Sequence, residues 1–299
     1  LIIRDLRGYL RDSAAADILL RTDLSSTIES VLGDCCGPTS RYNTIRQQVS
    51  SYVWDHYGEF DPEPSGDPKP GSMTRVLQAA LALQDLSTHA KPFVDLGCGV
   101  GRSTFELASR FETPVLGIDL HFPMLRVASG LTRDSRLRYP RRRVGMVYDR
   151  REFEVPLTKT ELVDFWACDA TALPFSVTSF DAAISMNLLD CVNSPMDLLH
   201  SISLALAEGG KALIASPYDW SESATAPELW LGGHSQRGDF EGASEPVLRE
   251  LLNPDSAHRI PGLKLVAETD QPWHVRLHDR SYVSYVSHIV AVEKRLNPS

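Results

Sequence analysis

The sequence is poor in cysteine and has no long apolar run, and each absence excludes a class of protein. Its five cysteines contain no Cys-x-x-Cys pair, and the adjacent Cys35 and Cys36 rarely ligate one metal together. We therefore expect free thiols, a reducing cytoplasm and no metal site.

No run approaches the roughly eighteen apolar residues that a membrane-spanning helix needs, so no membrane partner is expected. The first 17 residues carry charges throughout and lack the apolar stretch of a signal peptide.

Positive charge is also scarce, because the 299 residues have a formal net charge of −9. This balance makes a nucleic-acid partner unlikely, since general nucleic-acid binders are usually basic. One basic stretch is the exception: residues 121–160 hold ten Lys or Arg and four Asp or Glu, a local charge of +6. An anionic substrate or RNA could bind there, but a solvated surface helix and loop is the commoner use of such a stretch. The sequence does not indicate the oligomeric state.

A linker divides the chain, and strand and helix patterns alternate after it. Residues 61–72, DPEPSGDPKPGS, form this Pro- and Gly-rich linker. We assign residues 1–72 to a helical N-terminal extension and substrate lid, and residues 73–299 to the main domain. Strands are predicted over 91–97, 114–120, 162–169, 180–187, 211–217, 263–269 and 285–294, and helices over 103–111, 123–131 and 194–210. This alternation predicts a mostly parallel sheet covered on both faces, with ligands at the carboxyl ends of its strands.

A glycine-rich turn lies between the first strand and the first helix of this pattern. The stretch VDLGCGVGRS, residues 94–103, contains Gly97, Gly99 and Gly101. A dinucleotide site needs Gly-x-Gly-x-x-Gly, and Arg102 stands where its last glycine would be. Asp95 would also place a negative charge beside the pyrophosphate. Both features argue against a nicotinamide or flavin cofactor.

Acids at three successive strand ends favour S-adenosylmethionine, which is cationic and has no phosphate. Asp95 stands beside the glycine turn, where it suits the amino group and the sulfonium. Asp119 ends the second strand and can accept both ribose hydroxyls, and Asp169 ends the third and can hold the adenine amino group. Single aspartates are often turn or cap residues. Three aspartates in register with three strands fit this ligand and no phosphate-bearing one.

Five segments carry a family resemblance: FVDLGCGVGRSTFELA, VLGIDLHFPMLRVA, ACDATALPF, SFDAAISMNLLDCVNSPMDLL and LAEGGKALIASP. Over roughly residues 90–217 the chain resembles the class I S-adenosylmethionine-dependent methyltransferases, especially those that act on quinones and similar small molecules. The resemblance implies a Rossmann-like α/β fold, whose seven-stranded, mostly parallel sheet ends in an antiparallel strand at residues 285–294. It implies cofactor contacts from Asp95, Gly97, Cys98, Gly99, Arg102, Asp119, Leu120, Asp169, Ala170, Met186 and Asn187.

The outer segments carry a narrower resemblance. Residues 42–60, 216–233 and 270–294 are similar to the methyltransferase domain of ovothiol-biosynthesis enzymes, which is thought to methylate an imidazole nitrogen of 4-mercaptohistidine. The long insert between Asp119 and Asp169 is another feature of that domain. This resemblance implies N-methylation of a thiohistidine-like or other imidazole or amino-acid acceptor.

Segments that can close over the strand ends supply the candidate acceptor residues. Methyl transfer from a sulfonium needs alignment more than acid–base chemistry. Each segment also has a purely structural interpretation: a docking helix at 50–60, a hydrophobic plug at 216–238 and a solvated strand face at 273–280. The predicted catalytic residues are His56, Tyr57 and Asn187, and the predicted substrate-binding residues are Tyr52, Tyr57, Asp190, Tyr218, Trp230 and Arg276. Arg276 is assigned to a substrate carboxylate, which it could bind through two parallel hydrogen bonds.

Two rival functions remain open. One is an O- or C-methyltransferase of a ring metabolite. The other is a catalytically silent methyltransferase fold that serves as a partner or RNA-binding subunit. The intact glycine turn and the three acids argue against silence, because a silent relative has little need to keep them. A turnover assay distinguishes these possibilities, whereas cofactor binding alone does not.

Overall fold

The computed structural model describes residues 41–295, apart from 64–65, 67 and 88–89. The first 40 residues of the helical extension expected over residues 1–72, with Cys35 and Cys36, therefore lie outside the described residues. Within the part that is described, no helix combines the length and apolar character required to cross a membrane.

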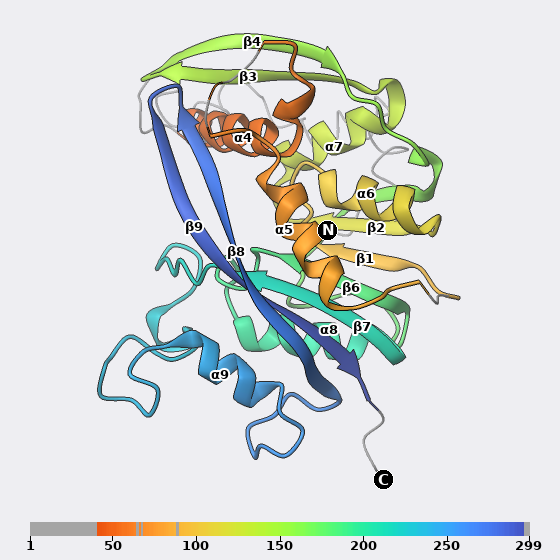
Figure 1. Cartoon of the computed structure of the whole chain (residues 1–299), viewed down its shortest axis with the longest axis vertical. Helices are drawn as coiled ribbons and strands as arrows, with labels where there is room; N and C mark the ends of the chain where they lie inside the picture. Colours follow the sequence, from red (N-terminus) through yellow and green to blue (C-terminus); the bar gives the residue numbers. More distant parts are fainter. Residues whose placement is uncertain (1–40, 64–65, 67, 88–89, 296–299) are drawn as a thin grey trace, which may run out of the picture.

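A seven-stranded sheet forms the centre of the molecule, in the order β5–β2–β1–β6–β7–β9–β8 (Figure 1). Its strands are β1 (Phe93–Leu96), β2 (Val115–Asp119), β5 (Val163–Ala167), β6 (Phe180–Met186), β7 (Leu206–Ser216), β8 (Leu263–His278) and β9 (Ser281–Lys294). The first five of these strands pair in parallel, and β9 runs antiparallel to both of its neighbours. The predicted Rossmann-like sheet, with its antiparallel last strand, is confirmed.

Helices cover both faces of the sheet. Successive residues of a strand point to opposite faces, and in the central strands both sets are apolar. On one face, Phe93 and Ile184 pack with α4 (Arg41–Tyr57), α5 (Ser72–Leu83), α6 (Arg102–Phe111) and α7 (Phe122–Asp134). On the other, Val94 and Ile214 pack with α8 (Pro195–Ala205) and α9 (Ser244–Leu251). Three short 3₁₀ helices, η1 (Gly58–Phe60), η2 (Thr160–Leu162) and η3 (Pro227–Leu229), lie in the connections. Strands buried on both faces have continuous apolar runs of this kind.

Several boundaries differ from the prediction, and β8, expected over 263–269, extends to His278. Helix α8 ends at Ala205, and β7 already begins at Leu206, so Gly209 and Gly210 lie inside the strand. The register of β7 against β6 is irregular there, since Leu206 pairs with Phe180 and Lys211 with Ala182. Helix α6 begins at Arg102, one residue before its predicted start, and the residue before it is Gly101, with a φ of 87°.

The basic stretch also differs from its expected form as a surface helix and loop. Its first part is α7, and the part expected to be a loop folds into a separate hairpin of β3 (Arg136–Val144) and β4 (Val147–Glu154), which crosses over α4 and α7 in Figure 1. Leu137 and Tyr139 alternate with exposed or half-buried arginines in β3, and Phe153 lies buried in β4. This alternation with period two buries one face of the hairpin and leaves the other charged.

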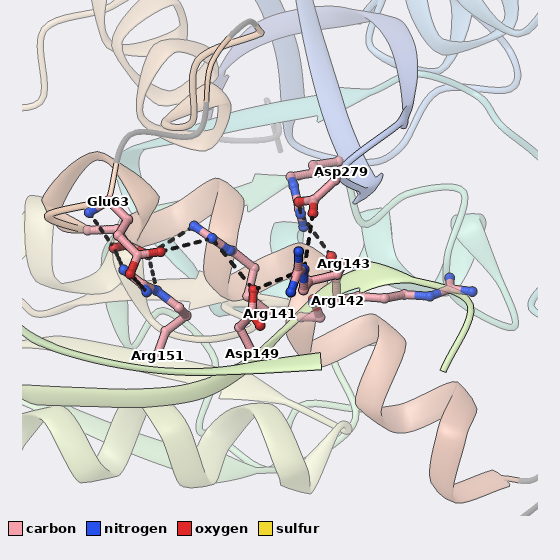
Figure 2. Close-up of polar contacts among 10 residues, drawn as sticks. Glu63, Arg141, Arg142, Arg143, Asp149, Arg151 and Asp279 are labelled. Atoms are coloured by element: carbon pink, nitrogen blue, oxygen red, sulfur yellow. Dashed lines mark hydrogen bonds and ion pairs between the residues drawn. The ribbon is translucent and has the colours of Figure 1, made fainter. Parts of the chain in front are cut away.

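Most of the arginines at the free end of this hairpin are held by acids, as Figure 2 shows. Arg151 donates from Nε to Asp61 Oδ2 at 2.9 Å and also pairs with Glu63. Arg141 reaches the same two acids at 3.5 and 3.3 Å. These ion pairs fasten the segment after η1 to the hairpin, so the local positive charge is largely compensated.

Candidate active site

A cavity of about 760 Å³ lies at the carboxyl ends of the central strands, with α4 along one wall. Sites for small molecules span about 300–1,000 Å³ and commonly lie at this edge of an open α/β sheet. The cavity therefore has the position and the size expected of the ligand site in this fold.

The glycine turn forms the floor of the cavity near β1. Its three glycines have φ angles of 70°, 54° and 87°, in the left-handed region that side chains with a Cβ adopt only under strain. Gly97 lines the cavity, and its N–H donates to the Ile118 carbonyl of β2 at 2.8 Å. A Cβ on Gly101 would lie 2.7 Å from the Phe165 ring. Glycine is thus required both for the turn and for the close approach of α6 to β5.

Asp119 and Asp169 stand at the cavity, at the ends of β2 and β5. Asp119 accepts the Gly99 N–H at 2.9 Å and the His121 N–H at 2.6 Å, so both of its oxygens are oriented by the backbone. Asp169 accepts the N–H and the hydroxyl of Thr171 at 2.8 and 2.7 Å through one oxygen. Both carboxylates line the cavity. Their remaining lone pairs suit the hydroxyls and the amino group of an adenosine, so the residues present fit the predicted cofactor.

The predicted cofactor residues divide into two groups. Those that line the cavity are Gly97, Asp119, Leu120, Asp169, Ala170, Met186 and Asn187. Asp95, Cys98, Gly99 and Arg102 are not among the residues that line it. The Asp95 carboxylate is 1% exposed and accepts the hydroxyls of Ser103 and Thr104, each at 2.6 Å. Burial raises the pKa of Asp95 to about 6. Asp95 thus braces the start of α6 instead of facing the ligand.

The contacts of Arg102 join protein elements to one another. Its guanidinium pairs with Glu59 and Glu106, both at 2.7 Å, and lies 4.8 Å from the centre of the Phe60 ring. These contacts join α6 to η1 and so hold the end of α4 against the glycine turn. The direct cofactor contact predicted for Arg102 does not match this geometry.

The wall formed by α4 brings Tyr52 and His56 to the cavity. His56 is 5% exposed, and its Nδ1 atom has no hydrogen-bond partner among the described residues. Burial, with a smaller contribution from Arg102, lowers the pKa of His56 to about 3. The imidazole is therefore neutral near pH 7 and suited to accept a hydrogen bond, while it is a weak base.

Tyr57 does not reach the cavity, although it is predicted as a catalytic and substrate-binding residue. Five residues of α-helix rotate a side chain by about 140° away from the starting one, here Tyr52. Tyr57 is accordingly 0% exposed, and its hydroxyl donates to the Val100 carbonyl at 2.9 Å. Its geometry is that of a core residue that supports the glycine turn from behind.

A chain of hydrogen bonds orients Asn187 at the end of β6. Asn187 has a φ of 54°, and its Oδ1 accepts the Ser287 hydroxyl at 2.7 Å. Ser287 in turn accepts the Trp273 indole N–H at 2.8 Å. Both Asn187 and Trp273 line the cavity, and so this chain fixes one wall across β6, β9 and β8.

Asp190 lies beside this wall and positions the loop after β7. It is 2% exposed, and it accepts the Ser216 hydroxyl at 3.1 Å and the Asp219 N–H at 2.7 Å. Burial raises the pKa of Asp190. Both aspartates line the cavity.

Three predicted substrate residues are held outside the cavity by other partners. The Tyr218 hydroxyl is 2.8 Å from His288 Nδ1, and the Trp230 indole donates to the Thr225 carbonyl at 2.9 Å. Arg276 is 1% exposed, donates to the Arg142 carbonyl at 2.8 Å and pairs with Asp279. The carboxylate clamp assigned to Arg276 is therefore replaced by a contact between β8 and the hairpin.

Several cavity residues were missed by the sequence analysis: Gln48, Ser51, Asp55, His121, Asp219, Trp273 and Tyr285. The sequence could have indicated some of them, because the spacing of Gln48, Tyr52 and Asp55 places these three residues on one face of a helix. Tyr285 carried no such signal, since its place beside the cavity depends on how far the long β8–β9 hairpin extends past the sheet.

The middle of the chain is similar to a known protein family. Residues 94–214 match the family model of the methyltransferase domain. The chain is 23% identical to the O-methyltransferase cnsE of Penicillium expansum over 255 residues, which cover 85% of this chain and 79% of that protein.

Solved structures share the fold at low sequence identity. The [4+2]-cyclase SpnF has a TM-score of 0.52 at 14% identity, with 84% of this chain and 97% of that chain covered. A chain from the complex of the Haloferax volcanii Trm112 methyltransferase activator with a methyltransferase also has a TM-score of 0.52, at 17% identity, with 85% and 99% covered. Taken with the glycine turn and the oriented carboxylates, the matches show that this chain is an enzyme with a class I, S-adenosylmethionine-dependent methyltransferase domain on a Rossmann-like fold.

Proposed function

We propose that the enzyme methylates a small-molecule acceptor bound in the 760 Å³ cavity between α4 and the strand ends. The observation that carries this proposal is the extent of the cavity. It continues from Asp119 and Asp169 past the glycine turn to Trp273 and Tyr285, so one continuous cavity has room for two ligands. S-adenosylmethionine, when bound, supplies an electrophilic methyl group on a sulfonium.

The residues of the cavity act mainly by alignment. Asp119 and Asp169 hold the ribose and the adenine, and the backbone at Gly97 admits the rest of the cofactor. Tyr52, His56 and Asn187 stand where the two ligands meet, and they orient the acceptor. Alignment of this kind can lower a barrier by about 7–11 kcal/mol, which suits an in-line displacement that needs no strong base.

Two acceptor types follow from the sequence and its relatives. The outer segments favour N-methylation of a thiohistidine-like or other imidazole acceptor. The O-methyltransferase relative favours a hydroxyl group on a ring metabolite. Arg276, which was expected to hold an amino-acid carboxylate, is engaged by Arg142 and Asp279, and this weakens the case for a free amino acid.

A turnover screen tests the proposal. The purified chain is incubated with labelled S-adenosylmethionine and histidine derivatives, quinols, phenols or tRNA, and both labelled product and S-adenosylhomocysteine are measured. We expect label in a small molecule. Label in tRNA alone, or saturable cofactor binding without turnover on any acceptor, would contradict it. The second outcome is a real alternative, because a [4+2]-cyclase has the same fold and a fold does not fix a reaction.

A further inference from the structure

The cavity has a cofactor half and an acceptor half, which follow from the strand order. Asp119 and Asp169 end β2 and β5, on one side of the β1–β6 centre. On the other side, Asp219 follows β7, and Trp273 and Tyr285 belong to β8 and β9. An adenosine held by Asp119 and Asp169 therefore leaves the β7–β9–β8 side, with α4 above it, to the acceptor.

The acceptor half is acidic. Among the described residues that line the cavity there are five aspartates and no lysine or arginine. Two of the aspartates belong to the cofactor half, and the other three, Asp55, Asp190 and Asp219, belong to the acceptor half. Asp55 accepts the N–H groups of Ser72 and Met73 at 2.8 and 3.1 Å, so part of its charge is offset by the start of α5. Asp219 is the most accessible of the three, with the Tyr285 hydroxyl donating to it at 3.0 Å.

Aromatic rings and one unpaired nitrogen complete this half. The rings of Trp273 and Tyr285 are stacked with centroids 5.0 Å apart, and Tyr52 faces the cavity from α4. Such rings attract a cation through their faces. His56 also belongs to this wall; its unpaired Nδ1 atom is fully buried, and burial lowers the pKa of the imidazole, so it adds no positive charge there.

The geometry points to an amine as the methyl acceptor: a basic nitrogen on an apolar or aromatic body, held by Asp219 and Asp190 against the aromatic wall. This inference rests on the proposed function. An anionic acceptor would meet three carboxylates and no cation. The cost of removing its charge from water would then not be offset by any ion pair. A protonated amine meets partners of opposite charge.

The reaction itself favours the same arrangement. The bound ammonium first releases a proton to water. The lone pair of the neutral amine then forms the nitrogen–carbon bond, and the carbon–sulfur bond breaks with its electron pair left on sulfur. The positive charge thus moves from the sulfonium to the acceptor nitrogen, and the new ammonium then releases a proton to water. Carboxylates fixed beside that nitrogen stabilise the charge where it develops.

Matched small probes test the inference on the full chain saturated with S-adenosylhomocysteine. Calorimetry compares 2-phenylethylamine, 2-phenylethanol and phenylacetate, which share a ring and differ in charge. We expect the amine to bind at least about tenfold more tightly than the alcohol and the acid, as one charged hydrogen bond predicts. Asp219→Asn should abolish this preference. Glu222→Gln, which removes the same charge from the same loop outside the cavity, should keep it.

Each outcome bears on the inference separately from the proposed function. Retained S-adenosylhomocysteine binding shows that Asp219→Asn is folded. If phenylacetate binds as well as the amine, if the amine does not bind at millimolar concentration, or if Asp219→Asn keeps the preference, the inference is wrong. The enzyme would remain a methyltransferase of another acceptor class. Failure of S-adenosylhomocysteine itself to bind would instead overturn the proposed function.

Discussion

The carboxylate of Asp119 accepts the backbone N–H of Gly99 at 2.9 Å, and this bond joins the end of β2 to the glycine turn after β1. The same carboxylate holds the His121 N–H with its other oxygen. A single side chain thus fixes two backbone segments of the cavity and presents its remaining lone pairs to a ligand. Cofactor binding and loop geometry should depend on it together.

Asp119→Ala should weaken S-adenosylhomocysteine binding at least about tenfold, because hydrogen bonds to a charged acceptor contribute about 1.5–3 kcal/mol each. Titration calorimetry measures the dissociation constant, and circular dichroism establishes that the variant is folded. Asp239→Ala, in an exposed loop outside the cavity, is the control and should leave the constant unchanged. An unchanged constant in folded Asp119→Ala would remove Asp119 from the cofactor site.

Gly101→Ala should destabilise the fold, by about 1–3 kcal/mol. The φ of 87° is unfavourable for alanine, and its Cβ would lie 2.7 Å from the Phe165 ring and 2.9 Å from Ala128 Cβ. Gly130→Ala is the matched control, because Gly130 lies in α7 with nothing within 4 Å of the added methyl group. It should stabilise the chain by about 0.5–1 kcal/mol. Urea unfolding measures both changes, and equal effects at the two sites would contradict the role of Gly101.

The sequence predicted the parts of the site that depend on local pattern. The glycine turn, Asp119 and Asp169 lie directly after apolar strands, and parallel strands bring their carboxyl ends to one edge. Rotation along a helix is also local, and Tyr57, five residues after Tyr52, faces the core although it is one of the predicted site residues. Asp95 shows a subtler limit. Its place beside the turn was right, but the hydroxyls of Ser103 and Thr104 draw its carboxylate into the core.

The remaining differences come from long-range partners, which a spacing pattern does not encode. Arg276 lies in β8, and its guanidinium meets the Arg142 carbonyl, 134 residues away in the chain. The basic stretch was expected to be a surface helix and loop because it has few apolar residues. Leu137, Tyr139 and Phe153 are the buried positions of two strands, and arginines occupy most of the positions between them. Its charge was correctly seen, but the acids that compensate it come from Asp61 and Glu63, before the first strand of the sheet.

His56 should make stability fall as the pH is lowered from about 6.5 towards 3. The pKa of an unfolded histidine is about 6.5, and burial lowers that of His56 to about 3. Between these values the unfolded chain binds a proton that the native state does not, so acid favours unfolding. The loss is at most about 1.4 kcal/mol per pH unit. Urea unfolding of wild type and His56→Gln across this range should show the wild type losing more stability towards acid.

Asp55 is the control, because its titration should change the stability with pH in the opposite direction. Burial raises its pKa to about 6, so between pH 6 and its unfolded value near 3.9 the native state binds the additional proton. The wild type should therefore gain stability relative to Asp55→Asn as the pH falls through 6. If both variants shift the pH profile in the same direction, the burial assigned to one of the two groups is wrong.

Asp61 should be the residue on which the attachment of the hairpin depends. Its side chain is 2% exposed and receives both Arg141 and Arg151, whose side chains are 11% exposed. Asp61→Ala leaves two largely buried guanidinium groups short of a partner, and breaking a buried pair in this way costs about 3–5 kcal/mol.

Glu63→Gln is the control. It changes a side chain that touches the same arginines but is 61% exposed, and an exposed pair contributes only about 0–1 kcal/mol. Urea unfolding should separate the two variants by at least about 2 kcal/mol, the difference between those ranges. Equal stabilities would mean that solvent reaches Asp61 freely and that the hairpin is held by its apolar face alone.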